Sequence, residues 1–124
     1  MQITYRIDAK QKTIFVKAKG EIAVEDLIAF EKKLLNDPLF EAGLNSFVDF
    51  SKARPTHDFD FDKIKKSLDF VESVQEKRGK CKWAVFAPYD YLYTFWLIFE
   101  GLSDNLIIEV KVFSNKEGPN IPIF

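Results

Sequence analysis

The stretch FVDFSKARPTHDFDFDKIKK, residues 47–66, carries the pattern on which the predicted fold depends. It opens with a short apolar strand at 47–50, continues through a polar loop, and enters a segment with helical spacing at 61–77. That segment has an acidic start and a basic end, as the helix dipole favours, and Gly79 supplies a stop signal. A strand that leads through a loop into a helix is typical of α/β proteins, in which the strands pair in parallel.

Strands and helices alternate over the rest of the chain. The segments before residue 20 alternate apolar and polar side chains, and Gly20 is expected to end the second strand. The predicted strands are 3–7, 13–18, 47–50, 83–87 and 107–113, and the predicted helices are 24–35, 61–77 and 89–102. On the second helix, Phe61, Ile64, Leu68, Val71 and Val74 are expected to face the core.

This order predicts an α/β fold with a five-stranded mixed sheet. The first strand runs antiparallel in a hairpin, and right-handed crossovers make the other strands parallel. Sheets that are covered on both sides have strands that are apolar throughout. Here the outer strands carry polar residues at alternate positions, so we expect the helices mainly on one face. A length of 124 residues suits a single domain, 1–124.

Composition excludes several classes of function. The net charge is -1, from 18 basic and 19 acidic residues, which gives no basic surface for nucleic acid. No apolar run reaches the roughly 20 residues of a membrane span, so an integral membrane protein is not expected. The N-terminus alternates instead of forming the apolar block of a signal peptide, and a single cysteine, Cys81, fits a reducing compartment. We therefore expect a cytoplasmic protein.

Several phrases of the chain resemble the SpoIIAA-like proteins, which are bacterial relatives of the STAS domain of anti-sigma-factor antagonists and have been linked to lipid-binding SEC14-type domains. These phrases are ITYRIDAKQKTIFVKAKGEIAVEDL, LLNDPLF, FVDFSKA, WAVFAPYDYLY and VKVF. The resemblance extends from Ile3 to about Phe113 and implies a STAS/SpoIIAA-like fold with an antiparallel edge strand. In the antagonists, the third strand leads through an aspartate to a serine that is phosphorylated at a helix start. This chain matches the aspartate as Asp49 but has PTHDFD in place of the serines, so Thr56 is the nearest phosphosite candidate.

The loop before the second predicted helix holds the only histidine, His57, beside Thr56 and Asp58. A catalytic histidine needs a nucleophile or a metal and an orienting partner. One histidine and one cysteine do not make a zinc site with the usual ligands. The simpler interpretation is that Thr56, Asp58 or Asp60 caps the helix. The sequence therefore predicts no catalytic residues, no metal and no other cofactor, and the protein is expected not to be an enzyme.

A polar rim at the carboxyl ends of the strands is one candidate binding site, because ligands of open α/β sheets collect there. Its predicted members are Asp49, Ser51, Arg54, Tyr89, Asp90, Ser114 and Asn115. In the alternative interpretation, Asp49 pairs with Arg54 or accepts backbone hydrogen bonds that order the loop.

The third predicted helix is the most unusual segment, since six aromatic residues lie between positions 89 and 99. Its charges are Asp90 and Glu100, so the helix is apolar almost all round and needs cover on more than one side. The cover beyond the sheet could be the second helix with the C-terminal IPIF, a second copy of the chain, or an apolar ligand. The candidate residues for a ligand or interface are Tyr89, Tyr93, Trp96 and Phe99.

These observations predict a non-catalytic binding or regulatory module that acts through protein contacts, as a homodimer that uses the aromatic helix. The alternative is a carrier or sensor of a small apolar molecule such as a lipid, held between the second and third helices.

Overall fold

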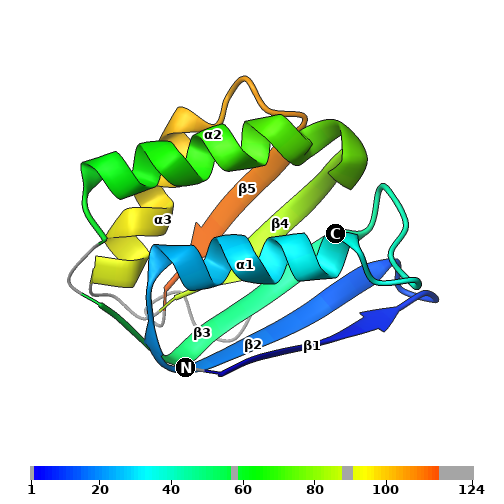
Figure 1. Cartoon of the computed structure of the whole chain (residues 1–124), viewed down its shortest axis with the longest axis horizontal. Coiled ribbons are helices and arrows are strands. Elements are labelled where there is room, and N and C mark those ends of the chain that lie inside the picture. Colours follow the sequence, from blue (N-terminus) through cyan, green and yellow to red (C-terminus); the bar gives the residue numbers. More distant parts are fainter. Residues whose placement is uncertain (1, 57–58, 88–90, 115–124) are drawn as a thin grey trace.

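The computed structural model describes residues 2–56, 59–87 and 91–114, and over these residues the chain forms five strands and three helices in the predicted order (Figure 1). The strands are β1 (Gln2–Asp8), β2 (Thr13–Ile22), β3 (Asn45–Pro55), β4 (Cys81–Phe86) and β5 (Ile108–Phe113). The helices are α1 (Val24–Leu35), α2 (Phe61–Arg78) and α3 (Tyr91–Leu102).

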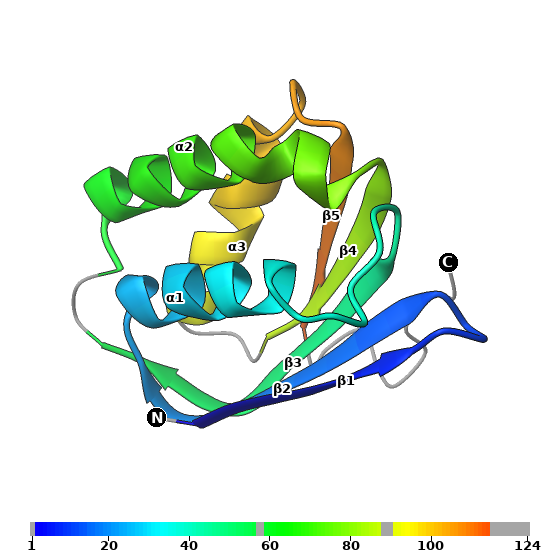
Figure 2. The same ribbon diagram turned by 45° about the vertical axis from the view of Figure 1, so that its right-hand side comes forward.

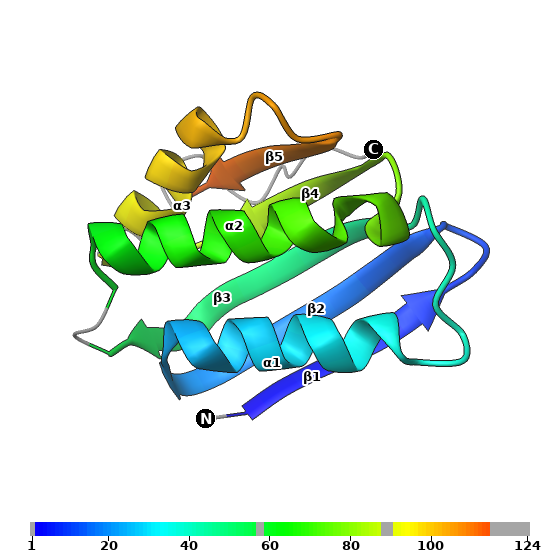
Figure 3. The same ribbon diagram turned by 45° about the horizontal axis from the view of Figure 1, so that its top comes forward.

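The sheet has the predicted mixed topology, with strand order β1-β2-β3-β4-β5. β1 pairs with β2 in antiparallel fashion, and β2, β3, β4 and β5 pair in parallel. All three helices lie on one face of the sheet (Figures 2 and 3). Both features confirm the fold predicted from the order and patterning of the segments.

Strands β2 and β3 are longer than predicted. β2 continues through Gly20, whose φ is 79°, as far as Ile22, and β3 continues to Pro55. The two extensions pair with each other, since Ile22 lies opposite Pro55. The strand register shifts between Lys17 and Lys19, as at a β-bulge. The predictions that β2 ends at Gly20 and that β3 ends at residue 50 are therefore wrong, because each extension is stabilised by its partner strand and not by its local pattern.

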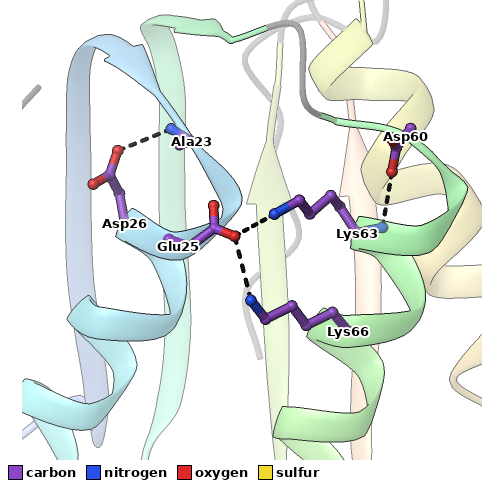
Figure 4. A network of polar contacts seen from close by, with 6 residues as sticks. All are labelled: Ala23, Glu25, Asp26, Asp60, Lys63 and Lys66. Atoms are coloured by element: carbon purple, nitrogen blue, oxygen red, sulfur yellow. Dashed lines mark hydrogen bonds and ion pairs between the residues drawn. The ribbon is translucent and has the colours of Figure 1, made fainter.

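The helix ends follow the expected capping chemistry. In α1, the Asp26 carboxylate accepts a hydrogen bond from the backbone N–H of Ala23 at 2.9 Å. Asp60 is the N-cap of α2 and accepts from the backbone N–H of Lys63 at 3.0 Å (Figure 4). Gly79, with a φ of 85°, ends α2 as predicted.

The core lies between the helices and the sheet. Of the predicted inner residues of α2, Ile64, Leu68 and Val71 reach it, but Phe61 is 58% exposed, so its prediction as a core residue is wrong. The apolar stripe of α2 meets the core only after the first turn. No described helix combines the length and the apolar character that crossing a membrane requires.

Candidate functional site

Three members of the predicted polar rim lie in a strand and not in a loop. Asp49, Ser51 and Arg54 belong to the extended β3. In the register of the parallel strands, Asp49 lies opposite Lys17 of β2 and Arg54 lies opposite Glu21. The half-buried Asp49 carboxylate accepts a hydrogen bond from the backbone N–H of Ser51 at 2.8 Å. This contact agrees with the alternative interpretation, in which Asp49 accepts backbone hydrogen bonds. The expected position of these residues in a loop is wrong because β2 and β3 pair further than their patterns indicate.

Of the other predicted polar residues, the structure describes Ser114 and Thr56. Ser114 is buried after β5, and Thr56 is half-buried, with its backbone N–H donating to the carbonyl of Ile22 at 3.0 Å. Phosphorylation of Thr56 stays a prediction. His57, Asp58, Tyr89, Asp90 and Asn115 lie outside the described residues.

The aromatic side of α3 is buried by the chain itself. Trp96 and Phe99 belong to the main core cluster, and Tyr93 is half-buried against that cluster. The ring of Trp96 stacks on Phe50 of β3 with centroids 5.9 Å apart, and it meets the ring of Phe99 at 5.2 Å. A second protein therefore cannot reach these two rings in this fold, but both of them line a cavity.

This cavity, of about 70 Å³, lies between α1, α2 and the sheet, with rings of α3 closing one part of it. Its lining includes residues of α2 and α3, the helices between which the sequence placed an apolar ligand, and it also extends under α1. Val48 illustrates the hollow, because it faces the helices from the central strand and is still only half-buried. The other lining side chains are mostly apolar. They include Val16 and Ala18 of β2, Leu27, Ile28 and Leu34 of α1, and Phe70 and Val71 of α2.

Among the described residues, three ion pairs join α1 to α2. Near the start of both helices, Glu25 accepts from Lys63 and, at 3.3 Å, from Lys66 (Figure 4). Near their ends, Nη1 of Arg78 donates to Oε2 of Glu31 at 2.7 Å, in the interior, and Nη2 of Arg78 donates to the Ser46 hydroxyl. The cavity therefore lies between two helices that are held together near both ends.

The electrostatics of these contacts follow from their surroundings. The hydrogen bond from Lys63 is the largest of the effects that lower the pKa of Glu25 to about 2, and Lys66 adds to it. Burial raises the pKa of the Cys81 thiol, and the neighbouring Arg78 and Trp83 offset part of that rise. Cys81 is thus a protonated, buried thiol beside the paired Arg78.

Four buried polar atoms in the described part of the chain have no hydrogen-bond partner in the protein. They are Ser67 Oγ, Arg78 Nε, Trp83 Nε1 and Trp96 Nε1, and all four residues line the cavity. The Cys81 sulfur lies near Arg78 and Trp83 but is a weak acceptor. An unpartnered buried donor destabilises the fold, so the cavity is suited to a guest that accepts hydrogen bonds.

The sequence analysis missed Glu31, Ser67 and Arg78. Their signal was present, since each is a polar residue at a position where the helical period requires an apolar one. Glu31 falls on the stripe of Val24 and Leu34, and Ser67 falls on the stripe of Ile64 and Val71. Within the described ranges, no group of three or more His, Cys, Asp or Glu side chains is arranged to hold a metal ion.

Comparison with known proteins supports the fold. No protein-family model and no curated protein sequence matches this chain. Among solved structures, it is similar to an uncharacterized protein of the DUF3478 family from Shewanella loihica PV-4, which has a SpoIIAA-like fold. The two chains are 14% identical and superpose with a TM-score of 0.53 over 93% of this chain and 88% of that chain.

Proposed function

We propose that this chain, which has the SpoIIAA-like fold, is a cytoplasmic carrier or sensor of a small apolar molecule and acts by binding, not by catalysis. The observation that carries the proposal is the apolar cavity between α1, α2 and the sheet. Protein interiors are close-packed, with few voids larger than a water molecule. A hollow under two helices is therefore a feature that needs a reason, and ligand binding supplies one.

The size of the cavity limits the part of the ligand that it can enclose. A water molecule needs roughly 10–15 Å³ of such volume, and an apolar cavity of about 150 Å³ binds benzene. The volume of about 70 Å³ thus accommodates a fragment of a few non-hydrogen atoms. A longer ligand would extend between Leu27 or Ile28 of α1 and Phe70 of α2, which line the cavity and are half-buried.

The charged groups of the lining favour binding over acid–base chemistry. Glu31 and Arg78 are paired with each other, so neither side chain is free to act on a substrate. Catalysis needs a convergent set of groups that can change their protonation or attack a substrate. The apolar walls and the paired charges of this cavity are instead the features of a binding site.

Tryptophan fluorescence offers a direct test, because the chain has two tryptophans and both line the cavity. We expect titration with hexane to shift the emission in a saturable way. Val48→Phe, which places an aromatic ring in the cavity, should abolish that response. Ile98→Phe adds a ring on the exposed side of α3 and is the matched control that should keep it. A native protein that responds to no apolar probe would rule out the proposed function.

A second proposal is a homodimer. Its interface is now placed on the exposed side of α3 and not on the buried aromatic rings. Four large apolar side chains on or just after this helix are exposed: Leu97 (46%), Ile98 (38%), Leu102 (49%) and Ile107 (45%). Exposed apolar side chains of this size are the kind that take part in protein contacts. In this proposal the aromatic side of α3 serves the cavity and its opposite side serves a second copy.

A further inference from the structure

Ser67 and Trp96 supply two of the unpartnered polar atoms, and both residues line the cavity. Each side chain is more than nine-tenths buried. The indole N–H can only donate a hydrogen bond, and the hydroxyl can donate or accept. Arg78 and Trp83, in contrast, lie beside the thiol of Cys81.

Two independent measures place Ser67 and Trp96 at the same end of the cavity, away from the ion pair of Arg78. Along α2, Ser67 precedes Arg78 by eleven residues, which corresponds to about 16 Å of helix. Along β3, Arg78 bonds Ser46 whereas Trp96 stacks on Phe50, four residues or about 13 Å further on. The cavity therefore has a charged end at Arg78 and an uncharged end at Ser67 and Trp96.

We propose that the uncharged end holds the polar head of the ligand, and that this head is a neutral hydrogen-bond acceptor such as the carbonyl oxygen of an ester, ketone or amide. This inference rests on the proposed function, because it specifies the ligand of the same cavity. A neutral oxygen satisfies the indole N–H and the Ser67 hydroxyl at once. The apolar remainder of the molecule then lies against Val48 and the inner side of α1.

A free carboxylate is disfavoured at this end. An anion that leaves water needs a cation or several donors to compensate for lost hydration. Arg78 is the charged donor of the cavity, but it lies at the other end and is already paired with Glu31. The site should therefore distinguish an ester from its own acid.

Three probes of similar size test this selectivity: methyl pentanoate, pentanoate and hexane, each titrated at pH 7 with tryptophan fluorescence as the signal. We expect methyl pentanoate to bind at least about ten-fold more tightly than the other two, the contribution of about one hydrogen bond. Ser67→Ala should reduce that ester preference, because it removes one of the two donors, and should leave the affinity for hexane unchanged. Ser73→Ala, which removes an exposed hydroxyl from the same helix, is the control that should behave as the native protein.

The outcomes separate this inference from the function on which it rests. Equal affinities for methyl pentanoate and hexane would overturn the neutral head and leave the apolar cavity as a binding site. Tighter binding of pentanoate, or an ester preference that is undiminished in Ser67→Ala, would also overturn it. Binding of none of the three probes would overturn the proposed function itself. Trp96→Phe, read through the remaining Trp83, should lower the ester affinity in the same way as Ser67→Ala.

Discussion

Arg78 and Glu31 are 47 residues apart in sequence, and Nη1 of Arg78 lies 2.7 Å from Oε2 of Glu31 in the protein interior. Their pairing joins the last turn of α2 to α1 at the charged end of the cavity. The guanidinium also lies over the ring of Trp83, with 4.9 Å between Cζ and the ring centroid.

Glu31→Gln should lower the free energy of unfolding by about 3–5 kcal/mol, because it leaves the Arg78 charge buried without its counterion. Urea denaturation at pH 7 measures the change. The double variant Glu31→Leu with Arg78→Met should recover most of the loss, since it removes both charges together. A double variant that is as unstable as Glu31→Gln would show that the pair itself, and not the isolated charge, determines stability.

The contact of Glu25 with Lys63 and Lys66 should make a pH-dependent contribution to stability. The pKa of Glu25 is lowered in the folded state, from 4.5 to about 2, so its contribution is present above pH 4.5 and is lost as the pH falls toward 2. Thermal melts of the native protein and Glu25→Gln should therefore differ at pH 6 and converge by pH 2. Glu72→Gln, a change of an exposed glutamate on α2, is the control. A difference that stays constant with pH would contradict the assignment.

Two glycines should respond to alanine in opposite directions. Gly79 has a φ of 85°, and a Cβ added there would lie 2.5 Å from the backbone nitrogen of Gly43, so Gly79→Ala should destabilise the fold by more than about 1 kcal/mol. Gly101 lies in α3 with no atom within 4 Å of an added Cβ, so Gly101→Ala should stabilise by about 0.5–1 kcal/mol. The denaturant midpoints of the two variants test both expectations. A stabilised Gly79→Ala would contradict the close approach of Gly79 to the backbone of Gly43.

Cys81 should react slowly with thiol reagents in the folded protein. It is buried, and burial raises the pKa of its thiol, so little thiolate is present at pH 7. Alkylation by iodoacetamide, followed by mass spectrometry, should be much slower in buffer than in urea. Equal rates in the two conditions would mean that the start of β4 opens freely in the native state.

The proposed homodimer makes a prediction that is independent of the cavity. Leu97→Glu combined with Leu102→Glu should convert a dimer to a monomer in sedimentation experiments, with little change in stability, because both side chains are exposed. Leu39→Glu changes a leucine that is 71% exposed elsewhere and should leave the assembly unchanged. A native protein that sediments as a monomer at micromolar concentration would refute the dimer and leave the ligand proposal intact.

The candidate site was only partly predictable from the sequence. The aromatic richness of α3 predicted a segment that needs cover, and Trp96 and Phe99 do line a cavity. Glu31 and Arg78 were missed because each reads as an isolated polar residue until α1 and α2 are placed side by side. The rim residues Ser51 and Arg54 were misplaced because the pairing of β2 with β3 extends beyond the apolar pattern of either strand.

The sequence by itself determined the order of elements, the end of α2 at Gly79, and the placement of the helices on one face of the sheet. These features depend on local periodicity and capping, which neighbouring residues encode together. Only the tertiary structure decided that the rings of Phe95, Trp96 and Phe99 are buried, that a hollow remains beneath α1 and α2, and that Ser67 and Trp96 share its uncharged end. Such properties arise from the volume left between elements far apart in sequence, and no segment carries that information alone.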